Sequence, residues 1–455
     1  MKSISKRTAF ALIMASVLLF GTLIFAVRYF LYSDQWVVFR NSPHIYNNSG
    51  TLDLGTVTDR DGKLLMDSGG GIRYSDDALT RKSVLHLLGD REGMIYQQIL
   101  PHYSDELVGY DKLNGTYHSV NGEGKCVLTV SAEVQAIAYQ ALNGRKGTVG
   151  VYNYRTGEIL CAVTSPSYDP DNVPSKVDDS SGIYINRFIN ATYTPGSIFK
   201  LVTTAAAIET KPELLEKTYT CSGSVTVNGE VITCPKAHGE QSYREALAHS
   251  CNCAFAEIAT GVGKSVLTEY AKKAGVTDSL EFDGFYTKTG NFDLSRADDN
   301  SVAWAGIGQY TDLVNPCAYM SFIGVIGGGG QAAKPYIVDK VLCGDKLLHS
   351  GKTVKTGQVL SQTTAGRLAE LMEYNTQTVY SSYARFPYGV TVCAKSGTAE
   401  VGVGSGNTAT FAGFIKDSRY PFAFIVVVEE GGAGSATCAP IAATVLQACI
   451  NAADK

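Results

Sequence analysis

Ser197 and Lys200 are the residues whose types and spacing best suggest covalent chemistry. They stand three apart at the end of the stretch Thr194 to Lys200, and on a helix this spacing places both side chains on one face, one turn apart. A hydroxyl beside an amine that can take its proton is an activated nucleophile. Thr194 is expected to cap the helix, so that the N–H of Ser197 points outward at its positive end. Ser3 and Lys6 have the same spacing, so the pair needs partners elsewhere.

A Ser-x-Asn triplet could provide the first partners. Acyl transfer needs a proton relay to the leaving amine, a cation for a substrate carboxylate and a second N–H for the oxyanion. Ser250 and Asn252 are two apart, so on a short loop they can face one cleft. The serine would then pass the proton, while the asparagine hydrogen-bonds the substrate amide and Lys200. The triplet at 405–407 has the same form, so this signal is weak by itself.

The segment from Lys395 to Thr398 is expected to supply the rest of the site. It follows a β-pattern run, and on a strand Lys395 and Gly397 point to one side while Ser396 points to the other. Gly397 lets a substrate backbone come close, and the N–H of Thr398 can complete an oxyanion hole. Two Lys-Thr-Gly triplets lack a preceding strand run and are interpreted as solvated turns: 288–290 and 355–357.

Helices and strands alternate around these residues. The run after Lys200 is small and apolar, as in a buried helix. Periodicity predicts strands at Gly147–Tyr152, Glu158–Val163, Gly389–Ala394, Thr408–Ile415 and Phe422–Val428. It predicts helices at Ala132–Leu142, Tyr243–Thr260, Ala318–Ile326, Ser361–Tyr374 and Ala439–Ala452.

The first third of the chain carries no candidate catalytic cluster. Basic residues precede an uncharged run, Ala9–Val27, of about 19 residues, which is long enough to cross a bilayer. The basic flank predicts a cytoplasmic N-terminus, and no cleavage site closes the run, so an uncleaved anchor with an extracytoplasmic remainder is expected. A turn-rich segment with a hairpin about Asp61-Gly62 follows. We therefore expect three parts: a cytoplasmic stub and anchor (1–31), a pedestal (32–146) and a catalytic domain (147–455).

Charge and cysteine content limit the partners. The 455 residues carry a net charge of −4, which gives no support for a nucleic-acid partner. The eleven cysteines lack repeated Cys-x-x-Cys pairs, and Cys251 and Cys253 are too close in sequence for one arm of a zinc site, so no metal and no cofactor is expected. Cys221 and Cys234 flank a predicted hairpin about Asn228-Gly229 and are the pair that a disulfide would join. Free buried thiols are the expectation for most of the others.

Together and in this order, the motifs resemble those of the penicillin-binding proteins, whose signatures are Ser-x-x-Lys, Ser-x-Asn and Lys-Thr/Ser-Gly. The similarity runs from about residue 50 to near the C-terminus and includes 59–62, 156–161, 165–170, 186–187, 308–309 and 394–400. Ser396 stands where threonine is commoner, and Thr410 where an aromatic residue often precedes Phe411. The segment before residue 126 is too short for the glycosyltransferase domain of class A members, so the resemblance is to class B.

The resemblance implies the α/β (α+β) transpeptidase fold, an antiparallel sheet flanked by helices with the active site between the sheet edge and the Ser197 helix. It implies a D,D-transpeptidase that crosslinks peptidoglycan stem peptides ending in D-Ala-D-Ala and is acylated by β-lactams. Desolvation and a cationic Lys395 would lower the pKa of Lys200. The catalytic residues would be Ser197, Lys200, Ser250, Asn252 and Lys395, and the substrate-binding residues Ser396, Gly397 and Thr398. A separate glycosyltransferase partner would polymerise the glycan.

Three other functions share some of these features. A serine β-lactamase uses the same triplets, but no Glu-x-x-Leu-Asn follows the Ser-x-Asn motif to activate water. A D,D-carboxypeptidase forms the same acyl-enzyme as a transpeptidase but lets water, not an amine, attack the ester. The sequence hardly distinguishes these two activities. A non-catalytic assembly scaffold would not need the intact motifs. A β-lactam sensor would need a cytoplasmic output domain, and the few residues before Ala9 are too short to form one.

Overall fold

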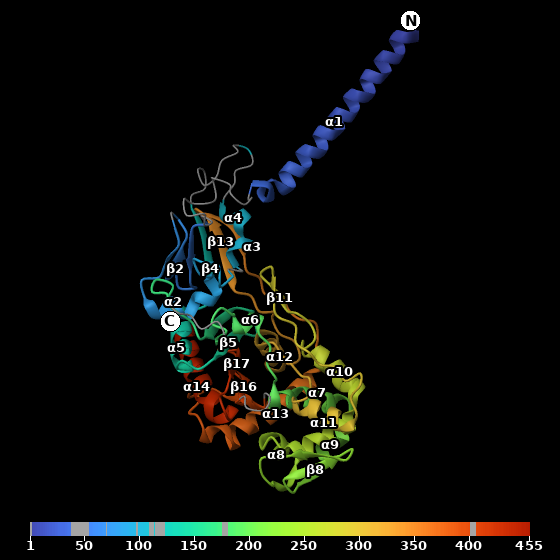
Figure 1. The fold of residues 1–455 in the computed structure, drawn as a ribbon, viewed down its shortest axis with the longest axis vertical. Coiled ribbons are helices and arrows are strands. Elements are labelled where there is room, and N and C mark those ends of the chain that lie inside the picture. The colour runs from blue at the N-terminus through green and yellow to red at the C-terminus, as the bar shows by residue number, and fades with distance from the viewer. Residues whose placement is uncertain are drawn as a thin grey trace.

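Helix α1 (Lys2–Val37) runs away from the rest of the protein in the computed structural model (Figure 1). The structure describes residues 2–37, 54–69, 71–96, 99–108, 113, 123–174, 181–400 and 406–455. The Ser5–Ser33 part of α1 is apolar and long enough to cross a membrane, and its apolar side chains are exposed. The other helix of that length and composition, α14 (Gly434–Ala453), packs with one side in the core. The predicted anchor is thus a candidate span.

A six-stranded sheet lies between α1 and the larger body, in the order β14-β13-β4-β1-β2-β3 (Figure 1). Its strands are β1 (Thr56–Thr58), β2 (Leu64–Asp67), β3 (Arg73–Tyr74), β4 (Gly124–Leu128), β13 (Val338–Cys343) and β14 (Lys346–Ser350). Helices α2 (Ala78–Leu88), α3 (Ile99–His102) and α4 (Ser104–Val108) lie in the same part of the chain. Strands β1 and β2 pair antiparallel, which confirms the predicted hairpin about Asp61-Gly62. Strand β13, drawn in orange in Figure 1, pairs antiparallel with β4 although it lies far from it in the sequence.

A five-stranded antiparallel sheet forms the centre of the body, in the order β15-β16-β17-β5-β6. Its strands are β5 (Gly147–Asn153), β6 (Ile159–Ser165), β15 (Val392–Ala399), β16 (Thr408–Ile415) and β17 (Phe422–Val428). All five predicted strands are present, but the one predicted at Gly389–Ala394 begins and ends later than predicted, as β15. Side chains alternate between two cores. Phe411 and Val426 pack with α14 and α5 (Ala132–Leu142), whereas Ala412 and Ile425 share the other core with α12 (Pro316–Gly327).

Strand β15 is the free edge of this sheet, and helices continue beyond it. These are η2 (Gly196–Phe199), α7 (Lys200–Thr210), η3 (Pro212–Glu216), α8 (Tyr243–Ala248), α9 (Asn252–Val262), α10 (Lys264–Lys273), α11 (Asp299–Ile307), α13 (Gln362–Thr378) and η4 (Tyr380–Ser382). The short helix α6 (Arg187–Asn190) packs instead against β5 and β6. Two small hairpins join β8 (Ser224–Val227) to β9 (Glu230–Thr233) and β11 (Glu281–Phe282) to β12 (Phe285–Tyr286), and β7 (Thr218–Cys221) pairs antiparallel with β10 (Gly239–Ser242) across the first of them. The helix predicted over Tyr243–Thr260 is wrong as one element, because it breaks between α8 and α9.

Candidate active site

Ser197 lies in the 3-10 turn η2, directly before α7. The turn is seated against β15, because Gly196 has φ +57° and a Cβ there would stand 2.6 Å from the carbonyl oxygen of Thr398. The N–H of Gly196 donates to the carbonyl of Gly308 at 2.9 Å. No side chain caps this turn, so the expected cap by Thr194 is wrong. Contact with the sheet edge, rather than a cap, fixes the nucleophile.

Lys200 is the first residue of α7 and is fully buried behind Ser197. Its Nζ donates to the carbonyl oxygen of Ser250 at 2.7 Å and to Oδ1 of Asn252 at 2.8 Å, and lies 3.3 Å from Ser250 Oγ. Burial lowers the pKa of Lys200 to about 7, while the neighbouring cysteines, chiefly Cys251, oppose the shift. A lysine with this pKa can be neutral near pH 7, as a general base must be.

Ser250 lies at the break between α8 and α9, where its φ of +57° is rare for a residue with a side chain. The N–H of Cys251 bonds back to the carbonyl of Ala246 at 2.9 Å, which stabilises this sharp turn. Asn252 then begins α9, and its side-chain N–H donates to the carbonyl of Thr233 at 2.9 Å. Ser250 and Asn252 therefore face Lys200 together, as predicted from their spacing.

Lys395 reaches the same serine from β15. Its Nζ lies 3.1 Å from Ser250 Oγ and donates to the carbonyl of Ser396 at 2.8 Å. The side chain is fully buried, and burial first, then the charge of Lys200, lower its pKa well below the ordinary value. At Lys200, burial is the chief cause of the shift. The two buried amines that share one hydroxyl cannot both be protonated without a large cost in solvation and repulsion.

The residues after Lys395 are held by contacts that sequence did not reveal. The Tyr380 hydroxyl accepts from the N–H of Ser396 at 2.9 Å and from its Oγ at 3.1 Å. Thr398 Oγ1 accepts from the N–H of Gly434 at 3.1 Å, and the Thr398 carbonyl accepts from Gln309 Nε2 at 3.3 Å. Tyr380 was missed because no local pattern marks a residue whose role depends on how η4 packs against β15.

A cleft of about 920 Å³ opens over this assembly. Six of the predicted site residues line it: Ser197, Ser250, Asn252, Ser396, Gly397 and Thr398. The two lysines lie behind them. Among the described residues, neither 288–290 nor 355–357 lines the cleft, but Asn407 does. Asn407 belongs to the second Ser-x-Asn match, whose Ser405 lies outside the described residues.

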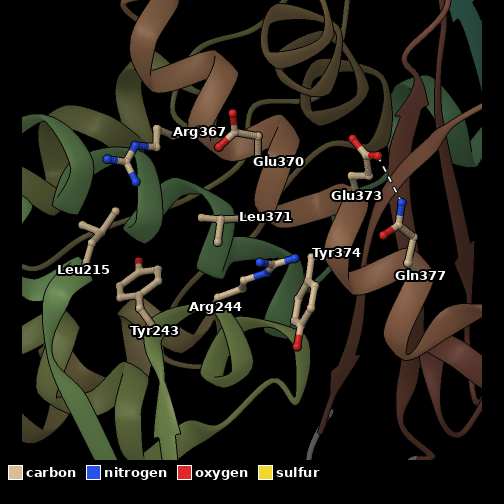
Figure 2. A pocket seen from close by; sticks show the side chains of 9 residues that line it. All are labelled: Leu215, Tyr243, Arg244, Arg367, Glu370, Leu371, Glu373, Tyr374 and Gln377. Carbon is tan, nitrogen blue, oxygen red and sulfur yellow. Dashed lines mark hydrogen bonds between the residues drawn. The ribbon is translucent and has the colours of Figure 1, made fainter.

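A second hollow, of about 410 Å³, lies between α8 and α13 (Figure 2). Its walls carry charged side chains from α13, including Glu370 and Glu373, and the Arg244 guanidinium lies 3.6 Å from the centre of the Tyr374 ring. Figure 2 shows Gln377 bonded to Glu373, at 3.1 Å. None of the predicted catalytic residues is among the described residues that line this hollow.

The cysteines confirm one expectation and overturn another: the free buried thiols expected for most of them are present, but the expected disulfide is not. All eleven lie within the described residues and are free, so the predicted Cys221–Cys234 disulfide is wrong. Instead, the sulfurs of Cys221, Cys234, Cys251 and Cys253 gather within 4.8 Å of one another, next to the Ser250 loop. A set of cysteines drawn from a hairpin region and a helix start has no paired Cys-x-x-Cys arms, so no linear motif marks it.

A serine, two buried lysines and a second serine that meet at one cleft are the constituents of an acyl-transfer site. Residues 147–447 match the family described as the penicillin-binding protein transpeptidase domain, and the chain belongs to that family. The peptidoglycan D,D-transpeptidase PbpA of Mycobacterium tuberculosis is 27% identical over 413 residues, covering 83% of this chain and 80% of that protein. Stage V sporulation protein D of Bacillus subtilis is 31% identical over 290 residues, covering 60% of this chain and 44% of that protein.

Solved structures show the same fold. The ceftriaxone acyl-enzyme complex of penicillin-binding protein A from M. tuberculosis superposes with a TM-score of 0.76 at 23% identity, covering 87% of this chain and 98% of that chain. The D,D-transpeptidase domain of a peptidoglycan glycosyltransferase from Eggerthella lenta gives 0.73 at 22% identity, covering 88% and 98%. The predicted transpeptidase fold is therefore confirmed.

Proposed function

We propose that the chain is a peptidoglycan D,D-transpeptidase whose acyl-enzyme forms on Ser197. The observation that carries the proposal is the position of Ser250 Oγ, 3.3 Å from Lys200 Nζ and 3.1 Å from Lys395 Nζ, on the wall of the cleft that Ser197 also lines. This hydroxyl connects the amine behind the nucleophile to the amine on the sheet edge. It provides the proton path that acyl transfer requires.

In the acylation step, the neutral amine of Lys200 accepts the proton of Ser197 as Oγ attacks the carbonyl carbon of the penultimate D-Ala. The backbone N–H groups of Ser197 and Thr398 stabilise the oxyanion. The C–N bond to the terminal D-Ala then breaks, and the proton passes from Lys200 through Ser250 to the departing amine. An amine of a neighbouring stem peptide attacks the ester, forms the crosslink and returns the proton to Ser197.

The terminal carboxylate of the donor peptide is bound by Lys395, Ser396 and Thr398. Lys395 has a strongly lowered pKa because it is buried and lies near Lys200. A carboxylate beside it favours the ammonium form. Substrate binding therefore places the shared positive charge on Lys395 and leaves Lys200 neutral, which couples recognition of the carboxylate to activation of the base.

Labelling with a fluorescent penicillin tests the site, since β-lactams acylate the same serine. The full chain in detergent is expected to carry one stable adduct on Ser197, and Ser197→Ala none, with Ser181→Ala as a matched control that labels normally. No adduct on the wild type would contradict the proposal and favour a non-catalytic scaffold, whereas rapid release would indicate a β-lactamase.

The group that attacks the acyl-enzyme, an amine or water, distinguishes a transpeptidase from a carboxypeptidase. With nascent glycan made by an added glycosyltransferase, the chain is expected to form crosslinked muropeptides in a Ser197-dependent manner. Release of D-Ala without crosslinks would assign a carboxypeptidase. The PbpA relative from M. tuberculosis, whose match covers 83% of this chain, is named a D,D-transpeptidase, which supports the first outcome.

The candidate span in α1 supports a single-pass anchor with the N-terminus in the cytoplasm and the cleft outside. Such a placement gives Ser197 access to peptidoglycan, and a separate glycosyltransferase in the same membrane supplies the glycan. Protease added to spheroplasts is expected to digest the chain beyond α1. Protection of the cleft domain would contradict this topology.

A further inference from the structure

Four cysteines that the proposed reaction does not use lie together beside the cleft. The sulfurs of Cys221, Cys234, Cys251 and Cys253 are all within 4.8 Å of one another, and those of Cys234 and Cys251 are 4.0 Å apart. A tetrahedral ion bound by four sulfurs at about 2.3 Å holds them about 3.8 Å apart. A disulfide bond is only about 2.05 Å long. The observed spacing therefore matches a shared ion better than two disulfides.

The surroundings of the sulfurs suit thiolate ligands. The N–H of Asn252 donates to Cys234 Sγ at 3.3 Å, and the N–H of Ala254 donates to Cys251 Sγ at 3.5 Å. Both donors belong to the first turn of α9, where the positive end of the helix favours negative charge. Nδ1 of His238 lies 3.4 Å from Cys234 Sγ. These groups hold the sulfurs from outside the cluster, as outer hydrogen bonds do at metal sites.

Three of the four cysteines of the cluster are buried from water. Cys221, Cys251 and Cys253 are 2%, 0% and 5% exposed, and Cys234 is half-buried at the cleft wall. Four protein ligands with no open position are typical of a structural zinc site rather than a catalytic one. An all-sulfur tetrahedral set also suits iron, but iron is distinguished by its visible absorption.

We propose that Cys221, Cys234, Cys251 and Cys253 bind one Zn²⁺ as a closed tetrathiolate site. On binding, the four thiols release their protons and four Zn–S bonds form, with no change of oxidation state. Two ligands come from the hairpin region, at the end of β7 and directly after β9, and two from the start of α9. The ion joins segments that meet only through their tertiary packing.

The position of the ion gives it an effect on the catalytic loop. Cys251 and Cys253 alternate with Ser250 and Asn252, and the Asn252 side chain bonds the carbonyl of Thr233, the neighbour of Cys234. The ion therefore ties the hairpin to the loop and stabilises the rare backbone angle of Ser250. This positioning effect rests on the proposed function, whereas metal binding does not.

Metal analysis of the purified full chain tests the site. Inductively coupled plasma mass spectrometry is expected to find about one zinc per chain, and X-ray absorption at the zinc edge four sulfurs at about 2.3 Å. Cys221→Ser should lose most of the zinc, while Cys438→Ser, a buried cysteine of α14 outside the cluster, should retain it. Cys234→His keeps a ligand and should retain zinc with a shell of three sulfurs and one nitrogen.

Several results would overturn the zinc site. They are wild-type protein without zinc after reconstitution under reducing conditions, iron as the bound metal, full zinc content in Cys221→Ser, or a mass showing two disulfides among the four cysteines. These readouts do not depend on activity. They also distinguish failure of the metal site from failure of the transpeptidase proposal, which shows as an absent Ser197 adduct.

The positioning effect has its own measurement. Removal of zinc from wild-type protein by a chelator is expected to slow Ser197 acylation by fluorescent penicillin about tenfold or more, and added Zn²⁺ should restore it. Unchanged acylation in the metal-free protein would overturn the positioning role, even with zinc bound in the starting sample.

Discussion

Acylation of Ser197 is expected to rise with pH through about 7, because the buried amine of Lys200 must be neutral to accept the serine proton. Burial lowers the pKa of Lys200 from 10.5 to about 7. The neutral fraction is then about one tenth at pH 6 and about nine tenths at pH 8, so the rate constant should rise about tenfold and then level off. An ordinary lysine would give about a hundredfold rise over the same interval, with no plateau.

Stopped-flow acylation by a fluorescent penicillin from pH 5.5 to 9 measures this curve. Lys200→Arg keeps a charged group that cannot accept the proton, so the rate should fall by about 10²–10⁴ and lose the inflection near pH 7. Lys355→Arg, at an exposed position outside the cleft, is the matched control and should follow the wild-type curve. A wild-type rate that is constant between pH 6 and 8, or normal acylation of Lys200→Arg, would refute Lys200 as the base.

Three further changes have expected outcomes. Gly397→Ala places a Cβ 2.3 Å from Thr410 Oγ1, so overpacking should destabilise the protein by about 1–3 kcal/mol in denaturant unfolding and slow acylation; unchanged values would contradict the close contact. Tyr380→Phe leaves the part-buried N–H of Ser396 without its acceptor and should lower the free energy of unfolding by about 1–3 kcal/mol; an unaltered unfolding midpoint would contradict this. Asp312 is buried without a hydrogen-bond partner, and burial raises its pKa well above the ordinary value. The native state therefore loses stability as pH rises through that pKa, so the thermal stabilisation by Asp312→Asn should be larger at pH 8 than at pH 5, and a constant difference would contradict this.

The sheet and its flanking helices could be predicted from local pattern alone. The bounds of β16, β17 and α5 agree with the sequence prediction residue for residue, because each is a sustained apolar run bounded by breakers. The convergence of Ser197, Ser250 and Lys395 was predicted from three motifs and their resemblance to a family. Ser197 and Ser250 do line one cleft, and the amine of Lys395 lies behind its wall, 3.1 Å from Ser250 Oγ, although the catalytic role of each residue stays a prediction.

Features that depend on tertiary packing could not be predicted in this way. The break of the helix at Ser250 needs a positive φ, which the helical pattern on both sides conceals. The Tyr380 hydroxyl reaches the N–H of Ser396 only because η4 packs against β15. The pairing of β13 with β4 likewise joins segments that lie far apart in the sequence. The four clustered cysteines come from a hairpin region and a helix start, so their spacing matches no linear metal motif.

The pairing of β13 with β4 has a consequence for the order of folding. A chain that emerges from its N-terminus delivers β1, β2 and β4 early, but the partner of β4 on its other side arrives only with Val338–Cys343. Until then β4 is an unprotected sheet edge, and the whole central part of the chain must be synthesised before the edge closes. Long-range pairing of this kind is slow to form, so the six-stranded sheet is expected to mature last, although its first strands are made first.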